Sequence, residues 1–441
     1  MKHSPLALAA VSLFLGVATA QAAPPKPLPN PDRAFRTQIV NHDGSGAEAT
    51  VSANRVCATM RNLARRGNGA TSLRVMNLSN GKNVCTLNPG ARRSLASNNK
   101  LFTTGTVLDR LGSAKTFRTL VLADGKVKGG TLTGNLYLRG GGDPSFGTGA
   151  FVDAYLAGQG TEVEKLAAQV KRAGIKRVTG AIFADDTIFD RLRGVADSGY
   201  TTSPWIGPLS GLSFNAGFTS SRLDRFSTDP ARLAARTLAR VLRARGVNVK
   251  PTVGLRKAPA KALRHVVARQ VSPDMAWMVR ITNLNSVNFW AETLLKDLGA
   301  YVRGSGTTAE GVKVVRRTMA GLDANVWPID GSGLTFGNRS TAHDVVRLLF
   351  KARSEPWGGA LFDSLPTAGV DGTLADRTRG SAAQRHCHAK TGTLTGVSAL
   401  SGYCFNASGR QFAFSILMNR VTNLTVAHNA QDRIAALIAR L

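Results

Sequence analysis

Alternating apolar and polar residues mark two groups of strands, one near each end of the chain. The first is TSLRVMNLSNGKNVCTLN at 71–88, where Asn80-Gly81 separates two alternating runs as a hairpin turn would. The second is GVSALSGYCFNASGRQFAFSILMN at 396–419, again two runs about a turn. An early and a late hairpin with helices between them predict an α/β domain whose sheet unites both ends of the chain.

Helices are indicated by their boundaries. Asp229-Pro230 starts a periodic apolar segment that Gly246 ends, as expected of a capped helix with proline in its first turn. Thr161 and Glu164 have capping-box spacing before LAAQVKRAG. Residues 430–441 have the spacing of a packed C-terminal helix.

The middle of the chain has a different pattern. GGTLTGNLYLRGGGDPSF at 129–146 and VTGAIFADDTIFD at 178–190 predict short strands with glycine-rich turns, and they are faintly similar to each other. The glycines at 140–142 lack the Lys-Ser or Lys-Thr of a phosphate-binding loop, so a nucleotide site is not favoured. We interpret residues 117–264 as one or more inserted accessory domains within a main domain formed by 49–116 and 265–441.

The N-terminus has the features of an export signal. Lys2 precedes an apolar run from Pro5 to Ala18 and the small-residue sequence Ala20-Gln21-Ala22, which predicts a signal peptide over 1–22. An uncleaved membrane anchor is the alternative. The proline-rich stretch 23–48 has little to bury and is interpreted as a linker. We therefore expect a periplasmic or secreted protein.

Charge and cysteine content fit that location. The chain has 57 Lys+Arg against 27 Asp+Glu, a net charge of +30, which favours polyanionic surroundings. No zinc-finger or aromatic-basic motif supports specific nucleic-acid binding. Electrostatic contact with an anionic envelope and a merely solvated basic surface both stay open.

Four cysteines suit a compartment in which disulfides persist. Chain order suggests Cys57 with Cys85 and Cys387 with Cys404, although four cysteines allow three connectivities. His386-Cys387-His388 fits a strand and lacks a matching second ligand pair, so neither a metal nor a cofactor is expected.

The chemistry begins with Ser97-Asn98-Asn99-Lys100, which opens an apolar-periodic helix. Residues three apart share a helix face, so the Lys100 amine can reach the Ser97 hydroxyl. A neutral lysine could take the serine proton, and burial beside another cation would favour that neutral form. The motif is weak alone because Ser79-Asn80-Gly81-Lys82 has the same spacing in a predicted turn.

Two later motifs favour Ser97. Lys390-Thr391-Gly392-Thr393 contains the single Lys-Thr-Gly of the chain, in strand-like sequence whose edge could pair with an extended peptide. Its glycine would let a substrate approach the backbone closely. Ser286-Val287-Asn288 lies between the other two motifs, although Ser-x-Asn also occurs at 52–54 and 213–215. Taken separately, Ser97 could be a helix-capping serine, Ser286 a loop serine and the Lys390 motif a basic surface strand. The occurrence of all three motifs in this order favours a catalytic site.

The sequence resembles a known family at this point. S-x-x-K, S-x-N and K-T-G in this order, with the flanks GNLYLRGGGDPSF, IDGSGLTFGNRSTA, LPTAGVDGTLADR and AKTGTLTGVSALSGY, resemble the class C low-molecular-mass penicillin-binding proteins. These are serine D-alanyl-D-alanine carboxypeptidases and endopeptidases. The resemblance implies a penicillin-recognising, transpeptidase/β-lactamase-like domain, an antiparallel sheet flanked by helices, with β-rich insertions. Peptidoglycan stem peptides are the implied substrates and β-lactams the covalent inhibitors.

The resemblance also implies a role for each motif residue. Ser97 is the acylated nucleophile, Lys100 is its base, and Ser286 relays a proton to the leaving D-alanine. The backbone N–H groups of Ser97 and Thr393 form the oxyanion hole. The remaining roles are substrate amide binding for Asn288, electrostatic tuning for Lys390, and carboxylate contact for Thr391 and Thr393 beside Gly392. Asp143 matches an aspartate that meets the amino end of the stem-peptide side chain.

One position departs from the family pattern. After Asp330-Gly331-Ser332-Gly333-Leu334, relatives commonly have Ser-Arg, whereas this chain has Thr335-Phe336. An arginine that would pair with substrate carboxylate is thus replaced, which leaves recognition of the diaminopimelate end open. The alternatives to a carboxypeptidase or endopeptidase are a β-lactamase or esterase on the same scaffold and a non-catalytic peptidoglycan-binding protein.

Overall fold

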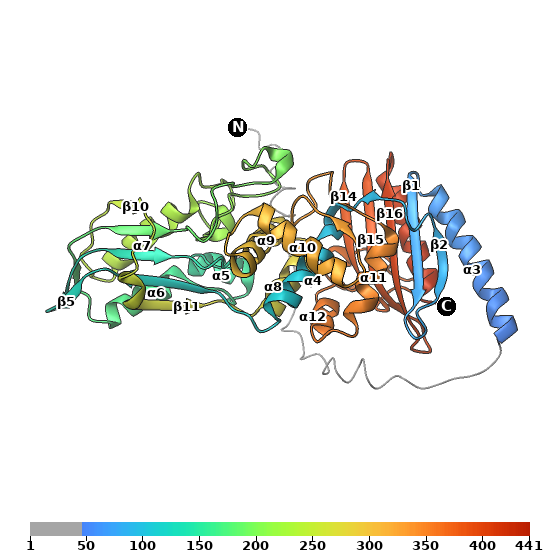
Figure 1. The fold of residues 1–441 in the computed structure, drawn as a ribbon, viewed down its shortest axis with the longest axis horizontal. Helices are drawn as coiled ribbons and strands as arrows, with labels where there is room; N and C mark the ends of the chain where they lie inside the picture. The colour runs from blue at the N-terminus through green and yellow to red at the C-terminus, as the bar shows by residue number, and fades with distance from the viewer. Residues whose placement is uncertain (1–45) are drawn as a thin grey trace. The chain divides into compact units, whose positions relative to one another are not determined.

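The computed structural model describes the backbone of residues 46–441 and the surroundings of side chains from residue 54 onward (Figure 1). The predicted signal peptide, 1–22, lies outside the described residues, as does the predicted linker 23–48 apart from its last residues. The described chain divides into two compact units. We call 46–113, 279–287 and 315–441 the terminal unit, and 114–278 with 288–314 the inserted unit.

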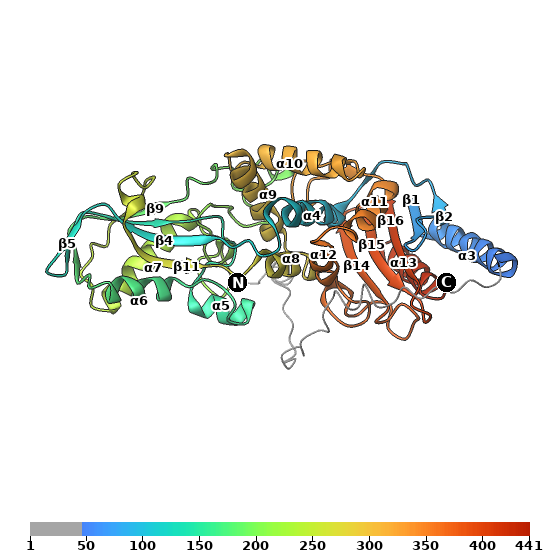
Figure 2. The same cartoon turned by 60° about the horizontal axis from the view of Figure 1, so that its bottom comes forward.

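A five-stranded antiparallel sheet forms the centre of the terminal unit (Figures 1 and 2). Its strands, in spatial order, are β14 (Cys387–Leu394), β15 (Val397–Phe405), β16 (Gln411–Asn419), β1 (Ala70–Asn77) and β2 (Asn83–Leu87). Strand β1 pairs with β16 from Ala70↔Asn419 to Asn77↔Phe412. Both predicted hairpins are present, and the prediction that the sheet unites early and late segments is confirmed.

Helices cover both faces of this sheet because its strands are apolar on both faces. Helices α3 (Gly46–Arg66) and α13 (Leu424–Ile438) share a core with β16 side chains such as Phe414 and Ile416. The alternate residues of these strands point to the other face of the sheet, toward α11 (Ala342–Ala352). There Tyr403 Oη donates a hydrogen bond to the carbonyl of Leu349. The result is the predicted antiparallel sheet flanked by helices.

Two disulfides lie in the α3/α13 core. Cys57 of α3 is bonded to Cys85 of β2, and Cys387 of β14 is bonded to Cys404 of the neighbouring β15. These are the pairs that chain order suggested.

The other elements of the terminal unit lie between β2 and β14 in the chain. They are β3 (Arg93–Ser94), η1 (Ala96–Asn98), α4 (Asn99–Leu111), β12 (Val326–Trp327), β13 (Arg339–Ser340), α12 (Gly358–Asp363) and η5 (Gly372–Leu374). Helices α8 (Met275–Leu284) and α10 (Thr308–Gly321) each cross from one unit to the other along the chain.

The inserted unit has a mixed five-stranded sheet. In spatial order its strands are β10 (Val253–Leu255), β9 (Ile182–Asp185), β7 (Leu136–Arg139), β4 (Arg118–Ala123) and β11 (Val266–Val271). Helices α6 (Val163–Arg172) and α7 (Pro230–Ala244) share the main core with this sheet. The unit also contains α5 (Gly149–Leu156), α9 (Asn288–Arg303), the small sheet β5 (Lys126–Lys128), β6 (Thr131–Thr133) and β8 (Arg177–Val178), and the short turns η2 (Ala196–Ser198), η3 (Asn215–Gly217) and η4 (Ala262–Arg264).

The two similar segments of the middle region are neighbours in this sheet. Strands β7 and β9 pair in parallel, from Leu136↔Ile182 to Arg139↔Asp185. After β7, Asp143 accepts hydrogen bonds from the amide and hydroxyl of Ser145. At the end of β9, Asp185 accepts the corresponding bonds from Thr187. The similarity therefore corresponds to two equivalent strand ends.

Two details differ from the sequence-based expectations. The inserted unit includes 114–116, 265–278 and 288–314 as well as 117–264, because β11 pairs with β4 and because α9 and the start of α10 group with the unit. The capping box at Thr161 and Glu164 is wrong: Glu162 is the N-cap without a side-chain cap, because Thr161 donates to Asp143 and Glu164 accepts from Gly149. The cap predicted at Asp229 is confirmed, since its carboxylate accepts from the amide of Arg232.

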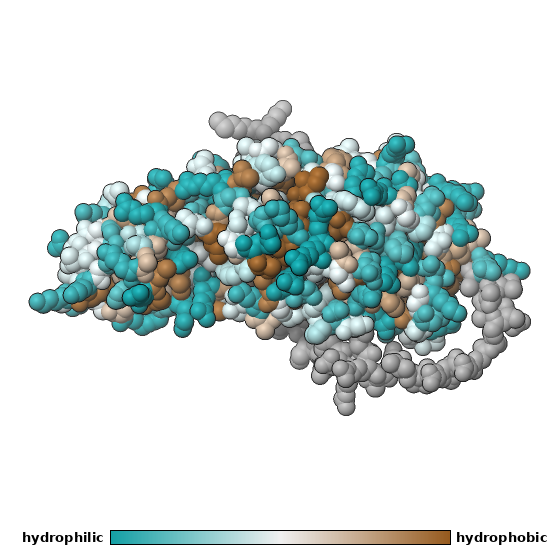
Figure 3. All heavy atoms as spheres, in the orientation of Figure 1, coloured by the Kyte–Doolittle hydropathy of each residue, from teal (hydrophilic) through white to brown (hydrophobic). Residues whose placement is uncertain are grey.

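The surface is predominantly hydrophilic on the face drawn in Figure 3, with apolar side chains in small groups between polar ones. Among the described residues, none of the helices combines the length and the apolar composition that crossing a membrane requires.

Candidate active site

Ser97 lies in a sharp turn immediately before α4. It is the middle residue of η1, and Ala96 before it has a left-handed φ of 45°. Lys100 follows in the first turn of α4, and its Nζ lies 3.0 Å from Ser97 Oγ. The serine is partly accessible, whereas the lysine is fully buried, with 0% of its surface exposed. The structure therefore brings together the predicted nucleophile and the predicted base.

The loop at 330–338 holds the Lys100 amine from the opposite side. Lys100 Nζ donates to the Ser332 carbonyl over 2.8 Å. The buried Asp330 carboxylate keeps the loop closed by accepting from the amides of Gly333 and Thr335, each over 2.7 Å. In the sequence, this segment contributed only to the family resemblance and to the departure at Phe336. Its supporting role was missed because the contact joins residues 232 positions apart.

Lys390 adds a second buried amine. It is fully buried in β14, and burial, followed by the charge of Lys100, lowers its pKa well below the usual lysine value. Asn98 Nδ2 donates to the Lys390 carbonyl over 2.9 Å, which fastens β14 to the turn that carries Ser97. Two nearby ammonium groups without water would repel each other, so the pair favours one neutral amine.

Gly392 makes the close contact between β14 and the Ser97 turn. A Cβ atom at this position would lie 2.9 Å from the Leu95 carbonyl and 3.0 Å from the amide nitrogens of Ser97 and Asn98. The turn that carries Ser97 fills the space on this side of the glycine. Close approach of a substrate to Gly392 stays a prediction. Its backbone conformation is not left-handed, so glycine is needed here for space.

Strand β14 forms one edge of the sheet, next to β15 alone. The segment 366–368 covers its first half, through a bridge between Thr367 and His388 and a hydrogen bond from Ala389 to Pro366. Among the described residues, no strand or bridge pairs with the outer edge from Lys390 to Thr393. That edge is thus available for an extended peptide.

The two threonines of the motif differ in accessibility. Thr391 is partly buried, and its Oγ1 forms a hydrogen bond of 2.7 Å with Thr373 Oγ1 of η5. Thr393 is exposed. Thr373 is a further site residue that motif spacing could not identify. The sequence feature that could have identified Thr373 is the segment LPTAGVDGTLADR, which contains it and which resembles the family.

Ser286 lies in the turn between α8 and α9, with a left-handed φ of 58° and 9% exposure. The end of α8 is fixed to α4 by Asn283, whose Nδ2 donates to Thr104 Oγ1 over 3.0 Å and to Ser364 Oγ over 2.8 Å. Thr104 in turn donates to the Lys100 carbonyl. Nothing in the sequence singled out Asn283, although it connects the Ser286 turn with α4, the helix that carries Lys100.

The remaining predicted site residues belong to the inserted unit. Asn288 begins α9 directly after the Ser286 turn, and its Nδ2 donates to the Trp205 carbonyl over 3.1 Å. Asp143 is buried, and both its carboxylate oxygens accept hydrogen bonds, from Ser145 and Thr161. Burial raises the pKa of the Asp143 carboxyl group. Its contact with substrate stays a prediction.

A serine hydrogen-bonded to a buried lysine at the start of a helix, next to an edge strand of an antiparallel sheet, is the arrangement of the penicillin-recognising serine hydrolases. The fold agrees with solved structures. Penicillin binding protein 4 from Haemophilus influenzae aligns with a TM-score of 0.72 at 19% identity, over 87% of this chain and 99% of its own. A predatory endopeptidase from Bdellovibrio bacteriovorus aligns with a TM-score of 0.54 at 18% identity, over 84% and 93%.

Sequence comparison identifies the family. The D-Ala-D-Ala carboxypeptidase 3 (S13) family matches residues 58–228 and 219–441, so this chain belongs to that family. A D-alanyl-D-alanine carboxypeptidase of Actinomadura is 31% identical over 86% of this chain and 82% of its own length. Carboxypeptidase DacB of Mycolicibacterium smegmatis is 28% identical over 98% and 93%. The chain is a serine-type hydrolase with carboxypeptidase activity, endopeptidase activity or both on peptidoglycan.

Proposed function

We propose that Ser97 attacks the carbonyl carbon of the penultimate D-alanine of a stem peptide and forms an acyl-enzyme. The contact of 3.0 Å between Lys100 Nζ and Ser97 Oγ carries this proposal, because a serine hydroxyl needs an adjacent base. The buried pair of Lys100 and Lys390 supports it, since repulsion between two amines without water favours a neutral one.

Protons balance across the acylation step. Lys100 takes the Ser97 proton as Oγ bonds to the carbonyl carbon, and the amides of Ser97 and Thr393 stabilise the resulting oxyanion. As the carbonyl of the new ester re-forms, Ser286 relays that proton from the Lys100 ammonium to the departing nitrogen, so Lys100 and Ser286 return to their starting states and the terminal D-alanine leaves as a neutral amine. The close packing of Gly392 on the Ser97 turn supports this pairing of amides. Water hydrolyses the ester in a second step.

Substrate binding follows the open edge of β14. The stem peptide extends along Lys390–Thr393, Thr391 and Thr393 contact its terminal carboxylate, and Asn288 holds its amide. The exposed Phe336 stands where relatives commonly have an arginine, so it offers an apolar contact in place of an ion pair. Asp143 would have to break its contacts with Ser145 and Thr161 to meet the amino end of the side chain.

The proposal extends to location and inhibitors. The signal-peptide pattern at 1–22 and the two disulfides support export to the periplasm or beyond. A penicillin binding protein 4 structure from Haemophilus influenzae contains a bound β-lactam. We propose the same class as covalent inhibitors of Ser97, because a strained lactam carbonyl acylates the same oxygen.

The experiment is covalent labelling with a fluorescent penicillin. Ser97→Ala should abolish the label, and Ser79→Ala is the matched control because Ser79 has the same spacing to a lysine but is hydrogen-bonded within its turn to Asn77. Full labelling of Ser97→Ala would refute the assignment. Release of D-alanine from a pentapeptide and cleavage of cross-linked peptidoglycan should be followed in parallel. The two rates show whether the terminal D-alanyl bond or the cross-link between stem peptides is cleaved faster.

A further inference from the structure

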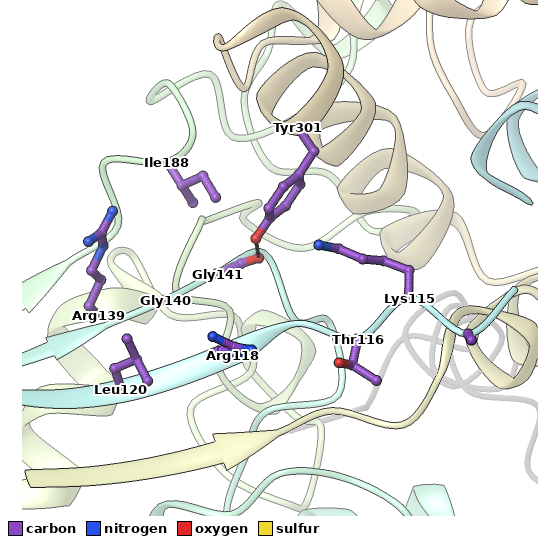
Figure 4. Close-up of a pocket in the computed structure, with 10 residues that line it drawn as sticks. Lys115, Thr116, Arg118, Leu120, Arg139, Gly140, Gly141, Ile188 and Tyr301 are labelled. Atoms are coloured by element: carbon purple, nitrogen blue, oxygen red, sulfur yellow. Dashed lines mark hydrogen bonds between the residues drawn. The ribbon is translucent and has the colours of Figure 1, made fainter. Parts of the chain in front are cut away.

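The inserted unit has a cavity of its own, about 620 Å³ in volume (Figure 4). It lies where the chain enters β4 and leaves β7, beside one face of α9. No residue that lines it belongs to the three catalytic motifs. The lining residues are Ala114, Lys115, Thr116, Arg118, Leu120, Arg139, Gly140, Gly141, Ile188 and Tyr301.

The charge of this cavity is of one sign. Lys115, Arg118 and Arg139 line it, and no lining residue is acidic. Arg139 has an acidic neighbour, Asp185, at a long 3.7 Å from its Nε. Lys115 Nζ lies 4.4 Å from the ring centre of Tyr301, a cation–π contact that holds the amine at the cavity wall. Figure 4 shows the Lys115 amine directed toward Tyr301 and Gly141, and Arg118 on the adjacent strand β4.

The groups behind the wall do not cancel this charge. Tyr301 Oη donates to the Gly141 carbonyl over 2.7 Å, which occupies the oxygen that would otherwise repel an anion. Asp297 lies directly behind, since a Cβ on Gly142 would be 1.9 Å from its Oδ1. Asp297 is fully buried, and burial, followed by the charge of Asp143, raises the pKa of its carboxyl group well above normal. The charge of Lys115 opposes this rise to a smaller extent, so the balance of these effects favours the neutral acid.

The walls also have apolar parts. Leu120, Ile188 and the Tyr301 ring lie between the cations. Guanidinium groups bind carboxylates in a bidentate manner, and apolar walls suit the carbon skeleton of a peptide. A phosphate polymer would need only a line of surface charges.

We propose that this cavity binds carboxylate groups of peptidoglycan stem peptides, as an anchoring site separate from the acylation site. The proposal rests on the proposed function, because that function makes the polymer the substrate. Bound through the cavity, the insoluble polymer would be retained between successive cleavages.

The test is co-sedimentation of the full chain with insoluble peptidoglycan at fixed salt. The variant Lys115→Ala/Arg118→Ala should bind about tenfold more weakly, since it loses two charge-assisted contacts. The matched control is Arg236→Ala/Arg240→Ala, which removes the same charge from two exposed positions of α7 in the same unit. The control should bind within about twofold of the original chain.

Chemically altered polymer identifies the ligand. Peptidoglycan with amidated carboxylates should bind the original chain about as weakly as unmodified polymer binds the cavity variant. Binding that depends instead on phosphate polymers attached to the wall would overturn the carboxylate assignment. Equal losses in the cavity and control variants would show that overall charge alone is responsible, and unchanged binding of the cavity variant would exclude the site.

D-Alanine release from a soluble pentapeptide separates the two proposals. The cavity variant should keep the original kcat/KM on this substrate while losing activity on insoluble polymer. If the original chain releases no D-alanine, the proposed function fails, and the sedimentation result still decides whether the cavity binds the polymer.

Discussion

Gly392→Ala gives a sharp test of how the nucleophile is positioned. The added methyl group would lie 2.9–3.0 Å from three backbone atoms of the turn that carries Ser97. An ordinary contact is about 3.4 Å or more, so strand and turn must separate by about 0.4 Å. The contacted atoms belong to the main chain, which cannot rotate away as a side chain could.

The expected cost follows from that displacement. Overpacking of this kind costs about 1–3 kcal/mol of stability. A misplacement of about 1 Å can cost about a hundredfold in rate, so about 0.4 Å corresponds to roughly a tenfold loss. The loss should appear in the acylation rate, because Ser97 and Thr393 supply the two proposed oxyanion-hole amides.

Stopped-flow acylation by a fluorescent penicillin measures this rate, and thermal unfolding measures the accompanying loss of stability. Gly105→Ala is the matched control: it lies in α4, and its added Cβ would meet side chains of Leu348 and Trp357 no closer than 3.6 Å. It should keep the acylation rate and gain about 1 kcal/mol from helix propensity. If Gly392→Ala acylates at the original rate, the proposed tight contact does not control the geometry.

Three further predictions concern the surroundings of the site and the stability of the fold. Thr373→Val removes the hydrogen bond to Thr391 and should lower kcat/KM for D-alanine release about fivefold, the equivalent of about 1 kcal/mol; an unchanged value would show that Thr391 needs no such support. Burial lowers the pKa of His388 to about 4, so the neutral ring is favoured in the folded state. Stability should therefore fall as pH drops from about 6.5 to about 4, by about 3 kcal/mol from this residue. His388→Gln should flatten that part of the urea-unfolding profile, and a parallel profile would contradict the assignment. Replacing both Cys57 and Cys85 by alanine opens a link across 28 residues and should lower the unfolding free energy by about 3 kcal/mol in urea, whereas no change would show that the link constrains little.

Local sequence patterns predicted the strands and the helix cap at Asp229 because each depends on neighbouring residues. Chain order alone suggested both disulfide pairs, and both are present. The spacing of Ser97 and Lys100 likewise predicted their contact, since both lie within one turn of chain. The capping box at Thr161 failed because a distant buried carboxylate, Asp143, takes its hydroxyl.

Longer-range features could not be derived from spacing. The Ser332 carbonyl reaches Lys100 across 232 residues, and Asn283 reaches Thr104 across 179. The contact of Gly392 with the Ser97 turn could not be derived for the same reason, since its sequence neighbours do not show what lies opposite. The extent of the inserted unit also depends on packing. Helix α9 groups with that unit, although it directly follows the Ser286 turn of the terminal unit in the chain.

The pairing of β1 with β16 sets an order of assembly. Strand β1 is synthesised early, but its partner ends at Asn419, and β14 with Lys390 is also made late. Contacts between such distant segments form slowly because a long loop must close first. Ser97 can therefore meet Lys390 and Thr393, with which it forms the proposed site, only after β14 has been made and paired, so we expect a chain without β14 to have no acylating activity.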